Sequence, residues 1–190
     1  DAVRAGASAL LVDHVLDLDV PQVVVDDVRL RLGPVCSAVY GDPSKRLEVV
    51  GVTGTNGKTS TVTMLAFVMQ GCGRPAASIG TLSGAFTTPE APELQRQFAE
   101  LADSGVVSVA VEVSSHALLL HRVEGTCFAA TVFTNLGRDH LDLHGSVEAY
   151  FEAKSRLFHE RYSELAVINV DDEWGRRIAK RTTQRCVPYS

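Results

Sequence analysis

A glycine-rich stretch directly after an apolar run has the residue types needed to hold a phosphate group. It reads GTNGKTS and comprises Gly54, Thr55, Asn56, Gly57, Lys58, Thr59 and Ser60. Where a buried strand turns through glycines into a helix, backbone N–H groups point at an anion, a lysine adds positive charge for the β- and γ-phosphates, and a threonine can bind Mg²⁺. Val52 stands where the strict pattern has glycine, so the match is to a variant. We predict a nucleoside triphosphate site; a glycine-rich turn without a ligand is the alternative.

Acidic and imidazole side chains come at the ends of two later apolar runs. Glu112 lies in the run at 106–113, and His140 and His144 follow the run at 129–134. Ligands of an open parallel sheet bind beyond the carboxyl ends of the strands, so these side chains are expected at the edge that carries the glycine-rich stretch. A buried carboxylate is costly unless it is paired or holds a metal. Metal binding is the functional interpretation, and a structural salt bridge or ordinary loop histidines are the alternatives.

Lys154 lies on the apolar stripe of an expected helix. Ser146 is a good N-cap, and Lys154 is seven residues after Val147, the first apolar residue of the stripe. Its periodicity favours a lysine whose ammonium reaches solvent. The alternative is a lysine drawn into a site, which would need lowered basicity or covalent modification beside a metal ion.

The elements that must position these residues alternate between short β-rich runs and helical patterns. Apolar runs that predict strands occur at 9–12, 23–25, 47–53, 76–79, 106–113, 129–134 and 165–169. Helical patterns lie between several of them; one ends at Gly71, and one has Pro92 near its start and Gly105 past its end. Apolar strands separated by helices predict an α/β fold with a mostly parallel sheet that is covered on both faces.

Composition and charge exclude several classes of protein. The 190 residues are 45% hydrophobic and 22% charged, as in a globular protein, and the net charge of −5 argues against a nucleic-acid partner. No apolar run approaches the ~20 residues of a membrane span. The four cysteines are far apart, which favours free thiols and a cytoplasmic location. The start at Asp1 and the absence of a signal pattern suggest a fragment without a secretory leader.

In combination, these motifs resemble the Mur ligase family, the ATP-dependent amide-forming ligases of peptidoglycan synthesis. The matching stretches run in family order over most of the chain: GTNGKTS at 54–60, TTPEAPEL at 87–94, EVSSHAL at 112–118, HRV at 121–123, FTNLGRDHLDLHG at 133–145 and YFEAKSRLF at 150–158. Within the family, the chain is most similar to the members that add the third amino acid to UDP-N-acetylmuramoyl-L-alanyl-D-glutamate. That activity, with meso-diaminopimelate as the added amino acid, is the function that the resemblance implies.

The resemblance also implies roles for individual residues. Residues 54–60 would hold ATP, with Lys58 on the transferred phosphoryl group. Thr59 and Glu112 would bind one Mg²⁺, and His140 a second. Lys154 would react with CO₂ to give a carbamate that helps to place the second ion, so Lys58, His140 and Lys154 are the expected catalytic residues. Contacts with the UDP-muramoyl dipeptide are expected from Thr87, Thr88, Ser114 and Arg122.

Two departures from the family pattern are Leu120, where some members have Gln, and Leu143, which replaces a common aromatic residue. The stretch Asn169-Val170-Asp171-Asp172 resembles a family turn, and no role is assigned to it. A related ligase such as a folylpolyglutamate synthetase and an inactive nucleotide-binding fragment are the other possibilities.

The resemblance finally implies a division into domains. Residues 1–44 would be the end of an N-terminal domain for the uridine nucleotide, and residues 45–190 would be a truncated central ATP-binding domain. The turn-rich linker at 40–45 marks this boundary. A C-terminal domain for the amino acid would be absent, so the fragment alone is expected to be inactive. We expect small-molecule substrates and a monomer.

Overall fold

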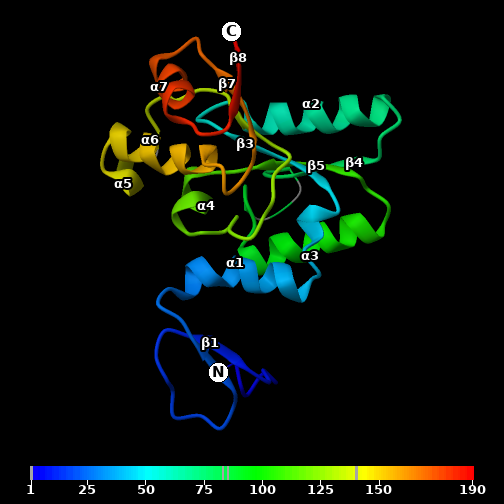
Figure 1. The fold of residues 1–190 in the computed structure, drawn as a ribbon, viewed down its shortest axis with the longest axis vertical. Coiled ribbons are helices and arrows are strands. Elements are labelled where there is room, and N and C mark those ends of the chain that lie inside the picture. The colour runs from blue at the N-terminus through cyan, green and yellow to red at the C-terminus, as the bar shows by residue number, and fades with distance from the viewer. Residues whose placement is uncertain (1, 83, 85, 140) are drawn as a thin grey trace.

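A parallel sheet of six strands organises most of the chain in the computed structural model, which describes residues 2–82, 84, 86–139 and 141–190 (Figure 1). The order across the sheet is β4-β5-β3-β6-β7-β8, and every neighbouring pair is parallel. The strands are β3 (Glu48–Thr53), β4 (Ala76–Ile79), β5 (Ser108–Glu112), β6 (Ala130–Phe133), β7 (Leu165–Asn169) and β8 (Arg185–Tyr189). The predicted α/β fold with a mostly parallel sheet is confirmed.

Helices connect these strands, as parallel pairing requires. They are α2 (Lys58–Gly71), α3 (Ala91–Asp103), α4 (Ser115–Leu119), α5 (Leu141–His144), α6 (Val147–Ser155) and α7 (Glu173–Arg181), with 3₁₀ turns at Pro43–Lys45 and Arg156–Phe158. Side-chain caps begin three of them, because Ser114, Ser146 and Asp172 accept hydrogen bonds from backbone N–H groups of the first turn. None of the helices in the described residues combines the length and the hydrophobicity of a membrane span.

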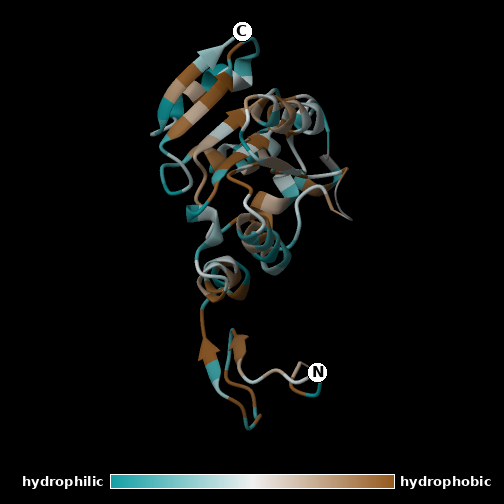
Figure 2. Ribbon diagram, turned by 90° about the vertical axis from the view of Figure 1, so that its right-hand side faces the viewer, coloured by the Kyte–Doolittle hydropathy of each residue, from teal (hydrophilic) through white to brown (hydrophobic). Residues whose placement is uncertain are grey.

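The two faces of the sheet have cores of different size. The large core joins α3, α4, α6 and α7 to the sheet; Phe98, Phe133 and Phe151 are fully buried in it. On the other face, the small core packs Val62 of α2 on Val50 and Val52 of β3. The hydrophobic strands are visible in Figure 2 between the helices. The large core therefore fixes the helix that carries Lys154.

The N-terminal segment forms a separate small sheet and one helix. β1 (Leu10–Val12) and β2 (Gln22–Val24) pair with each other in parallel and lie apart from the six-stranded sheet in both views (Figures 1 and 2). Helix α1 (Val28–Val39) instead packs on α3. A Cβ on Gly33 would lie 2.0 Å from the carbonyl oxygen of Glu124, so only glycine permits this approach. The division at residue 44 stays a prediction.

Candidate active site

Loops from neighbouring strands meet at the carboxyl edge of the sheet. β5, β3, β6 and β7 are adjacent and parallel, so the segments after them emerge on the same side. We call residues 54–60 the glycine loop, residues 134–139 the β6 loop and residues 169–172 the β7 turn. These segments lie side by side, and the glycine loop carries seven of the residues that the sequence nominates.

The glycine loop has a backbone that requires glycine at two positions. Gly54 has φ 149° and Gly57 has φ 86°, both in the region that side chains disfavour. A Cβ on Gly54 would lie 1.9 Å from Oγ1 of Thr134, so the loop and the β6 loop approach too closely for any other residue. Gly57 is the N-cap of α2, and its side-chain position is open. The positive end of the α2 dipole therefore faces this loop.

Lys58 is the first residue of α2 and lies half-buried at the loop. Its Nζ donates hydrogen bonds to the carbonyl oxygens of Gly54 at 2.9 Å and Thr55 at 3.0 Å. Burial lowers the pKa of Lys58, and the negative charges of Glu112 and Asp139 oppose this shift. The ammonium group is thus held where the loop turns into the helix.

Glu112 lies at the end of β5, with its side chain 1% exposed. Its Oε2 accepts a hydrogen bond from Oγ1 of Thr59 at 3.0 Å, and its Oε1 accepts one from the backbone N–H of Thr81 at 2.9 Å. Gly80 has no room for a side chain, because a Cβ there would lie 2.2 Å from Oε1 of Glu112. The predicted pair of Thr59 and Glu112 is therefore brought together, and its hydroxyl and carboxylate oxygens are the donors that Mg²⁺ prefers.

Lys154 projects from α6 into the interior, and its side chain is 1% exposed. Its Nζ donates to the carbonyl oxygen of Gly54 at 2.9 Å and lies 4.5 Å from the ring centre of Tyr150. Burial first, and then the charge of Lys58, lower the pKa of Lys154 to about 7, against the opposing effect of Asp139. The interpretation from periodicity, in which the ammonium reaches solvent, is wrong because the helix stripe faces the glycine loop rather than an outer edge.

The four residues nominated for a substrate line one hollow. Thr87, Thr88, Ser114 and Arg122 surround it together with Phe86, Ser115 and His116. Thr88 is fully buried, and its Oγ1 donates to the carbonyl oxygen of Glu112 at 2.8 Å and accepts from the N–H of Ser114 at 3.0 Å. The hollow is therefore joined directly to the strand that carries Glu112.

Arg122 is the cation of this hollow. Its guanidinium donates to the carbonyl oxygen of Thr88 at 3.1 Å, forms an ion pair with Glu90 at 2.6 Å and lies 5.2 Å from the ring centre of Phe86. Its Nε is buried and has no hydrogen-bond partner among the described residues. An anion bound here would meet a fixed guanidinium that is already balanced by Glu90.

Comparison with known proteins assigns the chain to a family. A model of the Mur ligase middle domain matches residues 52–190. The chain belongs to the Mur ligase family. It is 44% identical, over 94% of its length, to the UDP-N-acetylmuramoyl-L-alanyl-D-glutamate--2,6-diaminopimelate ligase of Alkalilimnicola ehrlichii, and 42% identical over its whole length to the enzyme of that name from Streptomyces coelicolor. It spans 40% of the length of each of these relatives.

A solved structure of a Mur ligase has the same fold along the entire chain. It is described as a UDP-N-acetylmuramoyl-L-alanyl-D-glutamate--2,6-diaminopimelate ligase and aligns with a TM-score of 0.86 and 33% identity. The alignment covers 100% of this chain and 41% of that one. The resemblance inferred from the motifs is thus confirmed for the family.

Some expected features of a Mur ligase site lie outside what the structure describes. His140, the expected ligand of a second Mg²⁺, is outside the described residues. His144 is described, and its Nε2 lies 3.0 Å from Oγ of Ser115. Within the described part of the chain, no group of three or more His, Cys, Asp or Glu side chains could hold a metal ion. The Thr59–Glu112 pair offers a hydroxyl and a carboxylate oxygen 3.0 Å apart.

Sequence reasoning missed four residues that shape this Mur ligase site. Tyr150 is 1% exposed, and its hydroxyl lies 3.3 Å from Oγ1 of Thr55. Asn135, Asn169 and Asp172 hydrogen-bond to backbone groups of the glycine loop or the β6 loop. The available signal was position, because Asn135 comes directly after a predicted strand and Asn169 is the last residue of another. Tyr150 has no comparable signal, because an aromatic residue on an apolar stripe normally predicts core packing.

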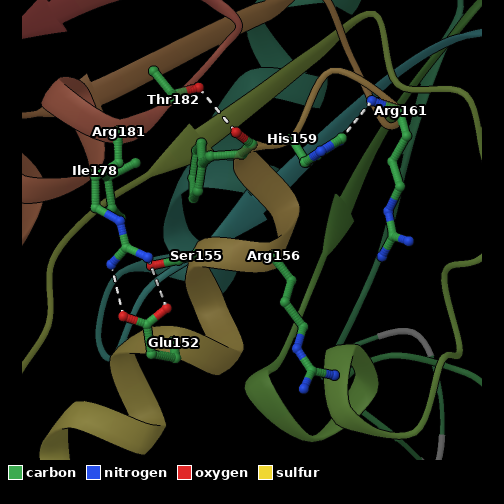
Figure 3. Close-up of a pocket in the computed structure, with 9 residues that line it drawn as sticks. Glu152, Ser155, Arg156, His159, Arg161, Ile178, Arg181 and Thr182 are labelled. Atoms are coloured by element: carbon green, nitrogen blue, oxygen red, sulfur yellow. Dashed lines mark hydrogen bonds and ion pairs between the residues drawn. The ribbon is translucent and has the colours of Figure 1, made fainter.

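A separate hollow between α6 and α7 contains none of the predicted site residues (Figure 3). Its volume is about 320 Å³, and Glu152, Arg156, His159 and Arg181 are among its lining residues. Arg181 forms two parallel hydrogen bonds with Glu152, at 2.6 and 3.0 Å, and Oγ1 of Thr182 donates to the carbonyl oxygen of Phe158. These contacts hold α7 on α6.

Proposed function

We propose that this chain is the ATP-handling part of an ATP-dependent amide-bond ligase that makes a cytoplasmic peptidoglycan precursor. In the proposed reaction, the third amino acid, meso-diaminopimelate, is joined to UDP-N-acetylmuramoyl-L-alanyl-D-glutamate. The observation that carries this proposal is the meeting of Lys58, Lys154 and the Thr59–Glu112 pair at one glycine loop. The two relatives named for this reaction, which match 94% or more of the chain, support the choice of substrate and amino acid.

ATP is the proposed ligand of Gly54, Thr55, Asn56, Gly57, Lys58, Thr59 and Ser60. The glycine backbone and the N-terminus of α2 suit the phosphate groups, and Lys58 is close enough to the loop to neutralise the transferred γ-phosphoryl group. Catalysis of phosphoryl transfer depends mainly on positioning and on charge neutralisation. These are the two contributions that this loop can make.

Mg²⁺ fits the Thr59–Glu112 pair. Both side chains offer oxygen, and the carboxylate of Glu112 is already held in place by a hydroxyl and an N–H group. When bound there, Mg²⁺ would neutralise phosphate charge during transfer. We assign a second ion to His140 and to a modified Lys154.

The modification proposed for Lys154 is a carbamate. Its pKa of about 7 means that much of the amine is neutral at neutral pH. The lone pair of a neutral Nζ can attack the carbon of CO₂, and loss of one proton from nitrogen then leaves a carbamate anion. The change removes a side chain that is partly cationic at neutral pH and places an anion beside Lys58. This would relieve the repulsion between the two lysines and supply an oxygen ligand for a metal.

The dipeptide substrate is assigned to the hollow of Thr87, Thr88, Ser114 and Arg122. Arg122 can hold a carboxylate in two parallel hydrogen bonds. The bound carboxylate would either displace Glu90 from the guanidinium or share the guanidinium with it. The hollow joins Glu112 through Thr88, so a carboxylate held there is near the proposed metal. This supports a D-glutamyl carboxylate as the group that receives the phosphoryl group.

The proposed reaction has two steps. First, an oxygen of the D-glutamyl carboxylate attacks the γ-phosphorus of ATP, the bond to the β-phosphate oxygen breaks, and an acyl phosphate and ADP form. Second, the amine of the amino acid attacks the acyl carbon, phosphate leaves, and the amine loses a proton. Lys58 would stabilise the charge on the transferred group, and Lys154 would act through its carbamate.

We also propose that the complete reaction requires domains outside this chain. Because the chain spans about two fifths of each relative's length, binding of the uridine nucleotide and of the amino acid is assigned to the remaining parts. Residues 1–44 would belong to the first of these domains and residues 45–190 to the central one. The whole enzyme would act as a monomer on small molecules.

The proposal is tested by supplying the whole protein with UDP-N-acetylmuramoyl-L-alanyl-D-glutamate, ATP and Mg²⁺ and measuring ADP release. We expect ADP only when an amino acid is added, with meso-diaminopimelate preferred over L-lysine. Preference for a folate and glutamate would favour a folylpolyglutamate synthetase, and nucleotide binding without turnover would favour a binding module. Lys154→Ala should lose activity and regain part of it with a small carboxylate such as acetate, and an unaffected variant would refute the carbamate role.

A further inference from the structure

The β7 turn, Asn169-Val170-Asp171-Asp172, is joined by side-chain hydrogen bonds to the β6 loop. Nδ2 of Asn169 donates to the carbonyl oxygen of Thr134 at 2.9 Å. Oδ2 of Asp172 accepts from the N–H of Leu136 at 3.1 Å, while its Oδ1 accepts from the N–H of Gly175 at 2.7 Å. One carboxylate therefore caps α7 and holds the β6 loop.

The β6 loop in turn forms hydrogen bonds with both Thr55 and Asn56 of the glycine loop. Oγ1 of Thr134 donates to the carbonyl oxygen of Asn56 at 2.7 Å. The amide of Asn135 accepts from the N–H of Asn56 at 3.0 Å and donates to its carbonyl oxygen at 3.1 Å. The N–H of Thr55 donates to the carbonyl oxygen of Asn135 at 2.9 Å. The backbone of the glycine loop is thus shaped by a neighbouring loop as much as by its own glycines.

A third contact fixes the side chain of Thr55. The N–H of Gly137 donates to Oγ1 of Thr55 at 2.8 Å, and the hydroxyl of Tyr150 lies 3.3 Å from the same atom. Leu136, which Asp172 holds, lies between Asn135 and Gly137 in the chain. Loss of the hydrogen bond between Asp172 and Leu136 would therefore move Asn135 and Gly137, which hydrogen-bond to Asn56 and Thr55.

The packing of α7 leaves the β7 turn little freedom. A Cβ on Gly175 would lie 1.7 Å from the carbonyl oxygen of Asn169, so the first turn of α7 lies directly on the end of β7. The N–H of Asp171 also donates to Oδ1 of Asn169 at 2.9 Å, which orients the amide that reaches Thr134. The turn is a rigid support for the β6 loop rather than a flexible connection.

We propose that Asn169 and Asp172 are positioning residues for nucleotide binding, which act by holding the β6 loop in the arrangement that shapes the glycine loop. This inference rests on the proposed function only in its assumption that the glycine loop binds ATP. Neither side chain is assigned a contact with the nucleotide. Both act through Thr134, Asn135 and Gly137.

The test uses Asp172→Asn, with Asp171→Asn as the matched control. Asparagine is a good N-cap and keeps one acceptor for the N–H of Gly175, but its NH₂ group would face the N–H of Leu136. Asp171 is exposed and adjacent, so its variant has the same change of charge. Asp172→Ser is a second variant, which keeps a capping hydroxyl that is too short to bridge both partners. Calorimetric titration of the whole protein with Mg²⁺·ADP gives the affinity, and urea unfolding gives the stability of each variant.

We expect Asp172→Asn and Asp172→Ser to weaken ADP binding roughly tenfold, because bonds to a charged group that fix a binding loop are lost. The KM for ATP should rise in the same proportion, while the KM for the muramoyl dipeptide and the affinity of Asp171→Asn stay within about twofold of the unmodified protein. Lower urea stability with unchanged ADP affinity in both Asp172 variants would overturn the inference. Asp172 would then serve only as the N-cap of α7. If the unmodified protein binds no nucleotide, the proposed function itself fails.

Discussion

Replacement of Lys154 by methionine should change how the stability of the protein depends on pH. Lys154 is 1% exposed, and its pKa is lowered from 10.5 to about 7 in the folded protein. Between these two values, the unfolded chain binds a proton at this lysine that the folded chain does not bind. The contribution of Lys154 to the free energy of unfolding therefore rises with pH across this window and is lowest below pH 7. Methionine has a similar length and no proton to bind.

The size of the effect follows from the slope of this linkage. One bound proton contributes about 1.4 kcal/mol per pH unit. Between roughly pH 7.5 and 9.5, the free energy of unfolding of the unmodified protein should therefore rise by about 2.7 kcal/mol relative to that of the variant. Below pH 7 the variant should be the more stable of the two proteins, because the buried ammonium is desolvated beside Lys58 and only partly offset by Asp139. The hydrogen bond to the carbonyl oxygen of Gly54 opposes this gain.

The free energy of unfolding of each protein is measured as a function of pH by urea unfolding in CO₂-free buffer. The fluorescence of the single tryptophan of this chain, Trp174, follows the transition. Lys180→Met is the control, because Lys180 is an exposed lysine on α7. Parallel pH profiles for the unmodified protein and Lys154→Met would refute the claim that Lys154 is buried with lowered basicity.

Three further substitutions test the geometry of the site. Glu112→Gln should weaken Mg²⁺-dependent nucleotide binding by about tenfold or more, since a carboxylate ligand is lost. Calorimetric titration with Mg²⁺ measures this, and Glu100→Gln is the exposed control. Equal affinities of the two variants would contradict the role of Glu112 as a metal ligand. Gly54→Ala should destabilise the protein by about 2 kcal/mol or more and abolish ADP binding, because its Cβ would collide with Thr134; normal urea stability would contradict the close approach of the two loops. Gly175→Ala should lower the free energy of unfolding by about 1–3 kcal/mol through its contact with the carbonyl oxygen of Asn169, and an unchanged urea midpoint would show that α7 can shift.

The sheet was largely predictable because its strands are short apolar runs. The predicted strands at 76–79 and 165–169 coincide with β4 and β7, and the others differ from the structure by one or two residues at one or both ends. Strand β8 was missed because it is an edge strand with Pro188 inside and largely exposed side chains. Helix α7 was missed because it is short and charged, with Trp174 and Ile178 as its apolar anchors and Gly175 between them.

The site was predictable where one short segment carries the chemistry, as in the glycine loop. It was not predictable where the environment decides the outcome. Lys154 lies on an apolar stripe in either interpretation, and only the position of α6 over Gly54 determines whether its ammonium is buried. The bonds from Asn169 and Asp172 join residues about 35 positions apart, so no local pattern reveals them. The roles of these residues follow from strand order, which places β6 between β3 and β7.

The proposed function depends on the activation of a carboxylate at this site by transfer of a phosphoryl group from ATP. Isotope transfer in the whole protein tests it most directly, with UDP-N-acetylmuramoyl-L-alanyl-D-glutamate labelled with ¹⁸O in the accepting carboxylate, together with ATP, Mg²⁺ and meso-diaminopimelate. One ¹⁸O atom should appear in the released phosphate for each amide bond formed, because the carboxylate oxygen that attacks phosphorus leaves with it. Unlabelled phosphate released along with the amide product would contradict transfer of the phosphoryl group to the carboxylate.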